Sequence, residues 1–331
     1  MTLDDFRQSL TAAEPPVGVT PQEPVVDDRM FDEFREIRRK VWFEATLGLP
    51  ANQRNLREMV IELTDKASLT LWRSIELKVR VELWEQFIAK IFYAGFEAAT
   101  VNAALPDIFH TFRDYKVLCS PDWDVRLNGR RLAQDSGRLV RSYFEDDSQK
   151  KILHPMKIRK IVKTGRLFSE YFGNSPEATA LSILLQPKES DDVWVVSQNL
   201  TQIGFSGELT QLHLMMDLGF DCIKPDIVMS RLVLAKGWLA HFPNQLPADL
   251  QEADLRGKGK YKNRFHYTNH VVIEPVVNLA RAFAAKMRQQ RETLERDIGW
   301  VSSNLIREFD IFMVSYGQRP DPSAGIVIQL G

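Results

Sequence analysis

The chain has 331 residues, of which 44% are hydrophobic and 26% charged, and a formal net charge of −1. This length allows two domains or one large domain, and the composition excludes a wholly disordered or fibrous protein. No uncharged apolar run is long enough for a transmembrane helix, and the start MTLDDFRQSL lacks the basic and apolar regions of a signal peptide. Only Cys119 and Cys222 are present, so we expect a reduced, cytoplasmic protein rather than a disulfide scaffold.

The charges are unevenly distributed along the chain. Residues 1–37 carry nine acidic side chains against three arginines, whereas residues 150–166 carry seven basic side chains and no acidic one. A second basic run without acids covers residues 256–264 (RGKGKYKNR). Such runs are typical of a surface that binds a polyanion, although either run alone also fits a solvated helix face or a flexible lysine loop.

In chain order, an acidic, proline-rich tail is predicted over residues 1–30. A helical core follows over residues 31–240, because apolar side chains there recur at three-to-four spacing. The segments with this periodicity are 31–47, 52–63, 74–102, 130–145, 157–172, 176–185, 191–203, 207–218 and 225–240. Pro106 and Pro121 are expected to interrupt the chain after the third of these segments.

Prolines and glycines mark residues 241–264 as a basic linker loop before a C-terminal helical extension over residues 265–331. The extension contains a predicted helix at 271–296. β-like patterns are confined to short stretches, chiefly 194–196 and 326–330. We therefore predict an all-α protein with an added C-terminal helical unit.

The most informative stretch is residues 202–231 (QIGFSGELTQLHLMMDLGFDCIKPDIVMSR). Gly204 and Gly207 bracket a turn between two helical segments, as is needed where the backbone takes a positive φ or approaches a ligand. A turn that leads into a helix N-terminus presents N–H groups that can bind a phosphate. Pro225 then predicts a new helix with Asp226 at its cap or in its first turn, where a carboxylate could stabilise a positive charge.

This stretch resembles the helix-hairpin-helix superfamily of base-excision DNA glycosylases. Members carry a hairpin of the type L-P-G-V-G-x-x-T-A and, one helix later, a catalytic aspartate in a pattern like V-D-x-x-V-x-R. Asp226 and Arg231 fit this pattern, whereas Ile203 replaces the hairpin proline and the two glycines are spaced G-F-S-G. The resemblance implies a two-lobed helical core and a catalytic role for Asp226. It also implies DNA contacts from Gly204, Ser206, Gly207 and Arg231.

Two upstream segments resemble the same superfamily in the expected order. Residues 87–102 look like its wedge-bearing helix–loop–helix, similar to the A-G-L-S-W-x-T-V stretch of 3-methyladenine DNA glycosylases and to S-A-Q-A-T-D-x-x-V-N of the endonuclease III group. Residues 156–162 (MKIRKIV) resemble the K-I-x-A-I-I segment between the wedge and the hairpin. The resemblance therefore extends over residues 75–240.

The resemblance and the basic runs together nominate further contact residues. Phe96 is the candidate wedge between bases, and Tyr93 and Trp194 are candidate walls for a flipped base. Aromatic side chains in apolar helices more often belong to a packed core. The candidate phosphate contacts are Lys157, Arg159 and Lys160 in the first basic run and Lys258, Lys260 and Lys262 in the second.

The implied chemistry is hydrolysis by water. Bifunctional members of the superfamily place a Schiff-base lysine just after the hairpin, where this chain has Glu208 and Leu209, and no lysine lies between Lys188 and Lys224. We therefore expect a monofunctional glycosylase in which Asp226 stabilises a cationic sugar after the base has left the duplex stack.

No cofactor and no metal are expected. The superfamily's iron–sulfur cluster needs four cysteines, and this chain has two. His266, His270 and Glu274 are spaced like metal ligands on a helix, but the basic loop before them and the proline after them favour a helix cap or phosphate contacts. Arg307 and Asp310 are further polar candidates that nothing in the sequence assigns.

The expected partner is double-stranded DNA, bound by a monomer without a membrane. The resemblance to 3-methyladenine glycosylases implies an alkylated purine as the excised base, and the atypical extension leaves a modified base of foreign DNA open. Two alternatives remain. One is a non-enzymatic helix-hairpin-helix DNA-binding module in which Asp226 is only a cap, and the other is a helical interaction protein whose basic runs are solvated faces.

Overall fold

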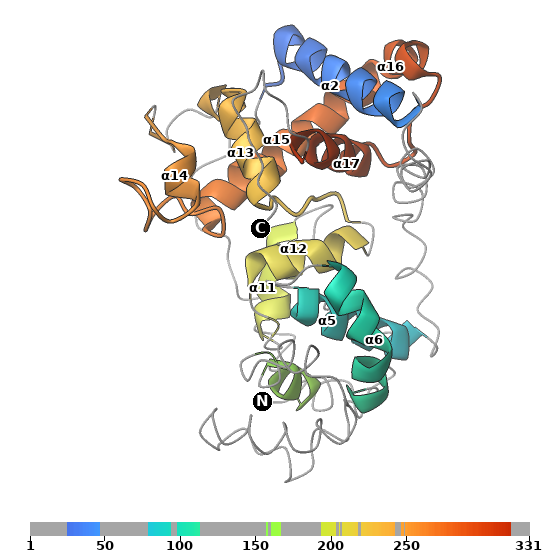
Figure 1. Ribbon diagram of the computed structural model, residues 1–331, viewed down its shortest axis with the longest axis vertical. Helices are drawn as coiled ribbons and strands as arrows, with labels where there is room; N and C mark the ends of the chain where they lie inside the picture. The colour runs from blue at the N-terminus through green and yellow to red at the C-terminus, as the bar shows by residue number, and fades with distance from the viewer. Residues whose placement is uncertain are drawn as a thin grey trace. The chain divides into compact units, whose positions relative to one another are not determined.

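The structure is a computed structural model that describes part of the chain. The described residues are 25–46, 79–93, 98–112, 157, 160–166, 193–202, 205, 207–217, 220–241, 246–247 and 249–318. They form helices joined by turns and loops, with no strand among them (Figure 1), which fits the predicted all-α class. None of the helices in these ranges has the length and apolar character needed to cross a membrane.

The chain divides into two compact units, each of which is treated by itself. Unit 1 consists of Met1–Val19 and Leu69–Leu214, and unit 2 of Thr20–Ser68 and Met215–Gly331. Unit 2 therefore combines residues from both sides of the main segment of unit 1. The linker and the extension that the sequence predicts after residue 240 both fall inside unit 2.

In unit 1, two helices cover the segment that resembles a wedge-bearing helix–loop–helix. They are α5 (Val79–Tyr93) and α6 (Ala98–Phe112), which pack on each other. The indole N–H of Trp84 donates to the carbonyl of Phe112 at 2.6 Å, and both side chains are fully buried. A helix pair is therefore present where the sequence predicts a single long stretch.

Pro106 lies inside α6, where the sequence predicts a break. A proline within a helix forgoes one hydrogen bond and crowds the preceding turn, at a cost of about 3 kcal/mol. The proline ring is exposed, whereas Val101, Ala104, Ile108 and Phe112 are buried at helical spacing. Burial of this apolar face outweighs the cost of the proline, so the helix continues to Phe112.

Two further helices of this region are α11 (Val193–Gln202) and α12 (Glu208–Asp217), and residues 160–166 are also helical. The stretch 194–196, which the sequence marks as β-like, lies within α11. Val193, Val196 and Leu200 of this helix are fully buried at helical spacing, which favours a helix over an extended strand. The other β-like stretch, 326–330, lies outside the described residues.

Unit 2 is built from helices that precede and helices that follow the main segment of unit 1 in the sequence. Helix α2 (Asp28–Thr46) packs against α16 (Arg291–Ile298) and α17 (Leu305–Gly317), and α17 also packs against α15 (His270–Gln289). Figure 1 shows α2, α16 and α17 together despite their distance in the sequence. Because α2 begins at Asp28, the last residues of the predicted acidic tail are helical.

Aromatic side chains fill the centre of unit 2. The ring of Phe34 in α2 lies 5.4 Å from that of Phe283 in α15 and 5.2 Å from that of Phe309 in α17. Trp42 stacks on Trp300 with ring centroids 5.3 Å apart. These contacts explain why α2 is long and stable, since its apolar stripe is buried in unit 2.

A buried arginine fixes α2 to the C-terminal helices. Arg38 is fully buried, and its Nε donates to Oε1 of Glu308 at 2.5 Å, while its two Nη atoms donate to the carbonyls of Leu294 and Trp300. The second oxygen of Glu308 accepts from the N–H of Ser302 at 2.6 Å. Each side-chain nitrogen of Arg38 and each carboxylate oxygen of Glu308 is thus hydrogen-bonded, as a buried ion pair requires.

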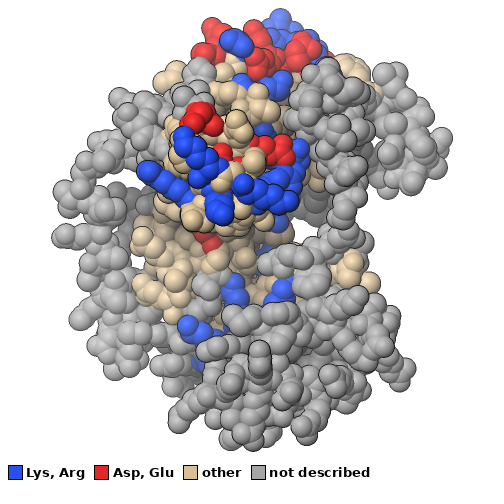
Figure 2. All heavy atoms as spheres, turned by 60° about the vertical axis from the view of Figure 1, so that its left-hand side comes forward, with Lys and Arg blue, Asp and Glu red and all other residues tan. Residues whose placement is uncertain are grey.

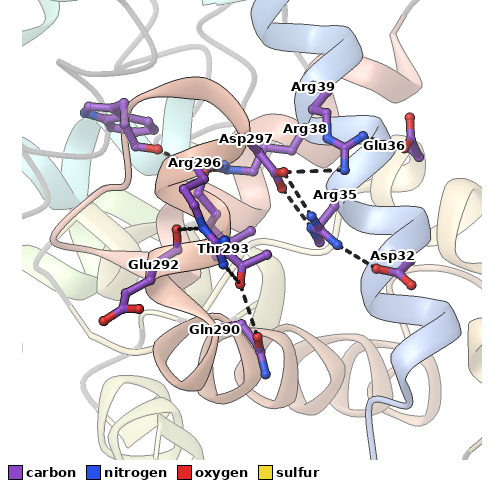
Figure 3. A network of polar contacts seen from close by, with 12 residues as sticks. Asp32, Arg35, Glu36, Arg38, Arg39, Gln290, Glu292, Thr293, Arg296 and Asp297 are labelled. Atoms are coloured by element: carbon purple, nitrogen blue, oxygen red, sulfur yellow. Dashed lines mark hydrogen bonds and ion pairs between the residues drawn. The ribbon is translucent and has the colours of Figure 1, made fainter.

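The same helix carries a second polar contact nearer the surface. Figure 3 shows Asp297 of α16 between Arg35 and Arg39 of α2, with Arg35 also reaching Asp32. The Nε of Arg35 lies 2.8 Å from Oδ2 of Asp297. Burial opposes ionisation of Asp297, but the hydrogen bonds from Arg35 outweigh it and lower the pKa of Asp297. The packing of α2 on α16 is therefore also electrostatic.

Candidate functional site

Asp226 is placed as the sequence predicts, at the start of a helix. It is the N-cap of α13 (Ile227–Ala235), and its Oδ1 accepts the N–H of Met229 at 3.0 Å while its carbonyl accepts the N–H of Ser230 at 3.0 Å. Pro225 is buried just before it, so the approach to the helix is fixed. The Asp226 side chain is half-buried, and its Oδ2 accepts no hydrogen bond from the described part of the chain.

Unit 2 also holds a buried ion pair on α17. On α17, Nη1 of Arg307 donates to Oδ2 of Asp310 at 2.5 Å. Burial raises the pKa of Asp310 to about 6, with the charges of Arg307 and Lys224 acting against the shift and the charge of Asp226 adding to it. Burial also raises the pKa of the Cys222 thiol, which is therefore neutral at physiological pH. Arg307 and Asp310, which the sequence left without a role, thus form a buried ion pair of unit 2.

In unit 1, α11 and the part of α12 up to Leu214 lie on either side of a turn at the position where the sequence predicts one. The N–H of Phe205 donates to the carbonyl of Leu200 at 2.9 Å, and Gly207 has φ of +103° before α12 begins. That φ strains any residue with a side chain, so a glycine is needed there. The predicted contact residues Gly204 and Ser206 lie outside the described residues.

The side chain of Gln211 in α12 is hydrogen-bonded to α11 and to the turn, a role that the sequence analysis did not identify. Its Nε2 lies within hydrogen-bonding distance of the carbonyl of Phe205 at 2.6 Å, the carbonyl of Ser197 at 3.0 Å and Oγ1 of Thr201 at 2.8 Å. Its Oε1 accepts the Ser197 hydroxyl at 2.6 Å. A polar residue at an otherwise apolar position of a predicted helix was the available signal, because a buried amide needs partners.

Of the first basic run, Lys160 lies close to this hairpin, and Lys157 contacts α5. A Cβ on Gly207 would lie 3.7 Å from Nζ of Lys160, and that Nζ lies 4.9 Å from the ring centroid of Phe205. Nζ of Lys157 donates to the carbonyl of Phe92 at 2.6 Å. Both side chains are half-buried, and burial lowers the pKa of each to about 8, with the charge of Lys160 adding to the shift of Lys157. Arg159 lies outside the described residues.

Two of the residues predicted to contact a base, Tyr93 and Trp194, are described in unit 1. Tyr93 is half-buried at the end of α5, where its hydroxyl donates to Asn102 and its ring centroid lies 6.0 Å from that of His213. Nζ of Lys90 lies 3.1 Å from Nε2 of His213. Trp194 is half-buried in α11, and the candidate wedge Phe96 lies outside the described residues. A role of Tyr93 or Trp194 beside a flipped base stays a prediction.

The second basic run belongs to an ordered lobe of unit 2, here defined as residues 249–269 and called the basic lobe. It contains the short helix α14 (Glu252–Leu255) and is built around Leu250, Leu255 and Phe265, which pack with Val272 of α15. Tyr261, Tyr267 and residues of α13 pack around the same small core. The predicted linker is therefore a folded element, because its apolar residues are buried rather than left in solvent.

Asp254 organises the backbone of the basic lobe. It is 2% exposed, and its two carboxylate oxygens accept the main-chain N–H groups of Gln251 and Tyr261 at 3.0 and 2.5 Å. Gly259 packs directly on it, so that a Cβ there would clash with Oδ1 of Asp254 and lie 2.7 Å from its backbone nitrogen. The glycines of RGKGKYKN thus mark a tightly packed turn instead of a flexible chain.

The basic side chains of this lobe point outward. Figure 2, which brings the α14 side of unit 2 forward, shows Lys and Arg side chains gathered there with Asp and Glu side chains beside them. Lys258, Lys260 and Lys262 are all exposed, and Nζ of Lys260 lies 3.2 Å from Oδ2 of Asp249. The fold therefore presents as one surface the lysines that the sequence nominated.

Arg231 takes a different place from the one expected of a DNA contact. It is 8% exposed, and its Nε forms an ion pair with Oε1 of Glu252 at 2.7 Å, while Arg256 donates to the same oxygen at 2.6 Å. Burial opposes ionisation of Glu252, but the two arginines outweigh it and lower its pKa. Arg231 therefore ties α13 to the basic lobe, and a direct contact with DNA would require this pair to open.

Comparisons of the chain with models of protein families, with curated proteins and with solved structures found no match.

Proposed function

We propose that this protein is a monofunctional DNA glycosylase, which hydrolyses the N-glycosidic bond of a damaged or modified base in double-stranded DNA. Asp226 is the proposed catalytic carboxylate, and it acts on the positive charge that develops on the sugar as the bond breaks. The base is flipped out of the stack first, because its glycosidic bond is not accessible inside a duplex.

The observation that carries this proposal is the position of Asp226. It lies at the start of a helix with one oxygen held by the N–H of Met229, and the other has no donor in the described part of the chain. Upstream in the chain, Gly207 takes a positive φ between α11 and α12, which supports the proposal. A half-buried carboxylate of this kind is pre-oriented, so it needs no reorganisation when charge develops near it.

Two basic surfaces support DNA as the partner. In unit 1, Lys160 lies by Gly207 and Lys157 contacts α5, and the basic lobe of unit 2 presents Lys258, Lys260 and Lys262 on a packed backbone. Contacts between lysines and phosphates supply affinity without reading the sequence of the duplex.

The proposal predicts that Asp226→Asn abolishes most base release without loss of folding. Asparagine caps helices as well as aspartate does, so α13 is retained, whereas the charge at the sugar is lost. Single-turnover formation of abasic sites, measured by alkali cleavage on duplexes with alkylated purines, deaminated bases or modified pyrimidines, should fall by roughly 10²-fold or more. Asp221→Asn, an exposed aspartate of the same segment, is the matched control and should retain the rate. An unchanged rate in Asp226→Asn removes this residue from the mechanism.

The absence of a lyase step is a separate prediction. With water as the nucleophile, the product strand should be an intact abasic strand, and borohydride should trap no covalent adduct between enzyme and DNA. The structure identifies the amine to check, because Nζ of Lys160 lies beside Gly207 although it is distant in the sequence. An adduct formed by the wild type and lost in Lys160→Gln would contradict the monofunctional assignment.

A second candidate is a non-enzymatic DNA-binding module. The cap bond between Asp226 and Met229 favours it, because that bond alone accounts for an aspartate at this position. In that case the wild type and Asp226→Asn would bind duplex DNA with the same salt dependence, and neither would release a base from any duplex of the panel.

A further inference from the structure

The carboxylate of Asp249 in the basic lobe is bound by two side chains that follow α14 in the sequence. Its Oδ2 lies 3.2 Å from Nζ of Lys260, and its Oδ1 accepts the hydroxyl of Tyr261 at 2.9 Å. The side chains of Asp249 and Lys260 are 59% and 70% exposed. The two oxygens of one exposed carboxylate are thus bound by an ammonium group and a phenol hydroxyl.

The two donors are held in place by contacts that do not involve Asp249. The ring of Tyr261 packs edge-on against Phe265 of the small core, with ring centroids 5.7 Å apart, and the main-chain N–H of Tyr261 donates to the buried Asp254. Nζ of Lys260 lies 4.6 Å from the centroid of the Tyr261 ring. Because Tyr261 is anchored through its ring and its backbone, its hydroxyl and the ammonium group of Lys260 stay side by side when Asp249 turns away.

This pair of donors also suits a phosphate. The two non-bridging oxygens of a phosphodiester share one negative charge and accept hydrogen bonds, as the two oxygens of a carboxylate do. Lysine ammonium groups and tyrosine hydroxyls are both donors to the phosphates of DNA. Lys258 and Lys262 flank the pair in the sequence and are exposed, so the pair belongs to the basic surface of the lobe. Asp249 therefore makes the contacts that a phosphate would make at this place.

We infer, on the basis of the DNA binding proposed above, that Lys260 and Tyr261 form a phosphate site and that Asp249 occupies this site in the free protein. A phosphate of the duplex replaces the carboxylate, which turns into solvent. Asp249 thus competes with DNA from within the chain and lowers the affinity of the basic lobe without being needed for its fold. The effect is moderate, because an exposed ion pair is weak in water, and it is the same for every duplex sequence.

The test is the affinity for duplex DNA, measured by fluorescence anisotropy on two duplexes of unrelated sequence. Asp249→Asn keeps the shape of the side chain and removes its charge, and it should bind both duplexes roughly threefold more tightly than the wild type. Asp249→Ala also removes the hydrogen-bond acceptor and should show a gain of the same direction. Asp221→Asn, which removes an exposed aspartate of unit 2 outside the lobe, is the matched control and should bind as the wild type does.

A double-mutant cycle separates displacement of Asp249 from a general effect of its charge. In Lys260→Gln/Tyr261→Phe the phosphate site is removed, while the ring at position 261 stays in the small core. Adding Asp249→Asn to this variant should change the affinity little, because Asp249 no longer has a site to occupy.

Two outcomes would overturn this inference although the wild type binds DNA. One is an unchanged or lower affinity in both Asp249→Asn and Asp249→Ala. The other is an equal gain with and without Lys260 and the Tyr261 hydroxyl, which would make Asp249 only a nearby negative charge. Neither result contradicts the proposed glycosylase, which is tested by base release. Absence of duplex binding by the wild type would overturn the proposed function and this inference together.

Discussion

The two basic runs of the chain differ in how the fold treats their charges. In unit 1, Lys160 is half-buried beside the Phe205 ring, and burial lowers its pKa to about 8. In the basic lobe of unit 2, Lys260 is exposed, and its contacts with Tyr261 and Asp249 raise its pKa. The first run therefore includes two lysines, Lys157 and Lys160, whose pKa is lowered to about 8, whereas the pKa of Lys260 in the second run is raised.

This difference separates two ways of binding a phosphate. The exposed lysines of the basic lobe attract a polyanion at long range and release counterions when they contact it. The half-buried lysines near Gly207 exchange water for a phosphate only at close range, and the phosphate in turn stabilises their charged form. Sequence composition counts both runs as the same kind of positive charge.

The largest effect on DNA binding is expected from neutralising the basic lobe. In Lys258→Gln/Lys260→Gln/Lys262→Gln the slope of log K against log salt should become shallower by about 2.7, which is about 0.9 for each phosphate that a lysine no longer neutralises. Affinity near 0.1 M salt should drop by roughly 10²-fold for all duplex sequences alike. Fluorescence anisotropy titrations over a salt series measure both quantities. An unchanged slope, with activity lost on one base type only, would mean that the basic lobe selects the base.

A smaller effect is expected from loosening the lobe without changing its lysines. Asp254→Ala removes the acceptor of the Gln251 and Tyr261 N–H groups, which should destabilise the lobe by about 1–3 kcal/mol and weaken DNA binding by roughly tenfold. Hydrogen exchange of residues 249–269 should rise, while that of the helical hairpin in unit 1 stays the same.

Asp249→Ala is the matched control for this change, because Asp249 is an exposed aspartate of the same lobe whose bonds go to side chains. Its effect on exchange should be small. Equal exchange in Asp254→Ala and Asp249→Ala would show that the lobe is not held by Asp254.

The smallest effect is expected from pH acting on the run near the hairpin. Raising the pH from 7 to 9 removes protons from Lys157 and Lys160, whose pKa values are about 8, and should weaken DNA binding several-fold. Lys157→Gln/Lys160→Gln should bind with little dependence on pH over this range, whereas the triple variant of the basic lobe should keep the dependence of the wild type. A pH dependence that persists in Lys157→Gln/Lys160→Gln and disappears in the triple variant would place the pH-sensitive lysines in the basic lobe instead.

The same lysines make a prediction about stability, with the sign set by linkage. In the unfolded chain a lysine has a pKa near 10.4, so between about pH 8 and 10 the unfolded state binds more protons than the folded state. Folding stability should therefore rise with pH across this window in the wild type. Lys160→Met should show a smaller rise in chemical unfolding experiments at pH 7, 8, 9 and 10.

Sequence periodicity was sufficient to predict helices whose apolar faces pack against segments that are close in the sequence. The segments predicted at 191–203 and 207–218 correspond to α11 and α12 within two residues. The cap at Asp226 followed from the proline before it, because local chemistry alone fixes a helix start. Predictions of this kind need no information about distant parts of the chain.

Other features depend on contacts that the sequence does not reveal. The basic lobe resembles a linker in composition. Its Gly259 is needed because the backbone there packs closely against Asp254, and this contact exists only in the folded chain. The packing of α17 against α13 is likewise a contact that the spacing of residues does not indicate. Pro106 suggested a helix end, and tertiary burial of α6 overrode this local preference.

The buried pair of Arg38 and Glu308 joins residues that lie 270 positions apart, with consequences for how the protein is made. On the ribosome, α2 emerges before the main segment of unit 1, but the helices that cover Phe34 and Arg38 are synthesised only after that segment. The main segment of unit 1, Leu69–Leu214, is complete well before them. We therefore expect unit 1 to fold first, while the apolar face of α2 is still exposed to solvent. Until α17 has been synthesised, this exposed face makes the nascent chain dependent on chaperones.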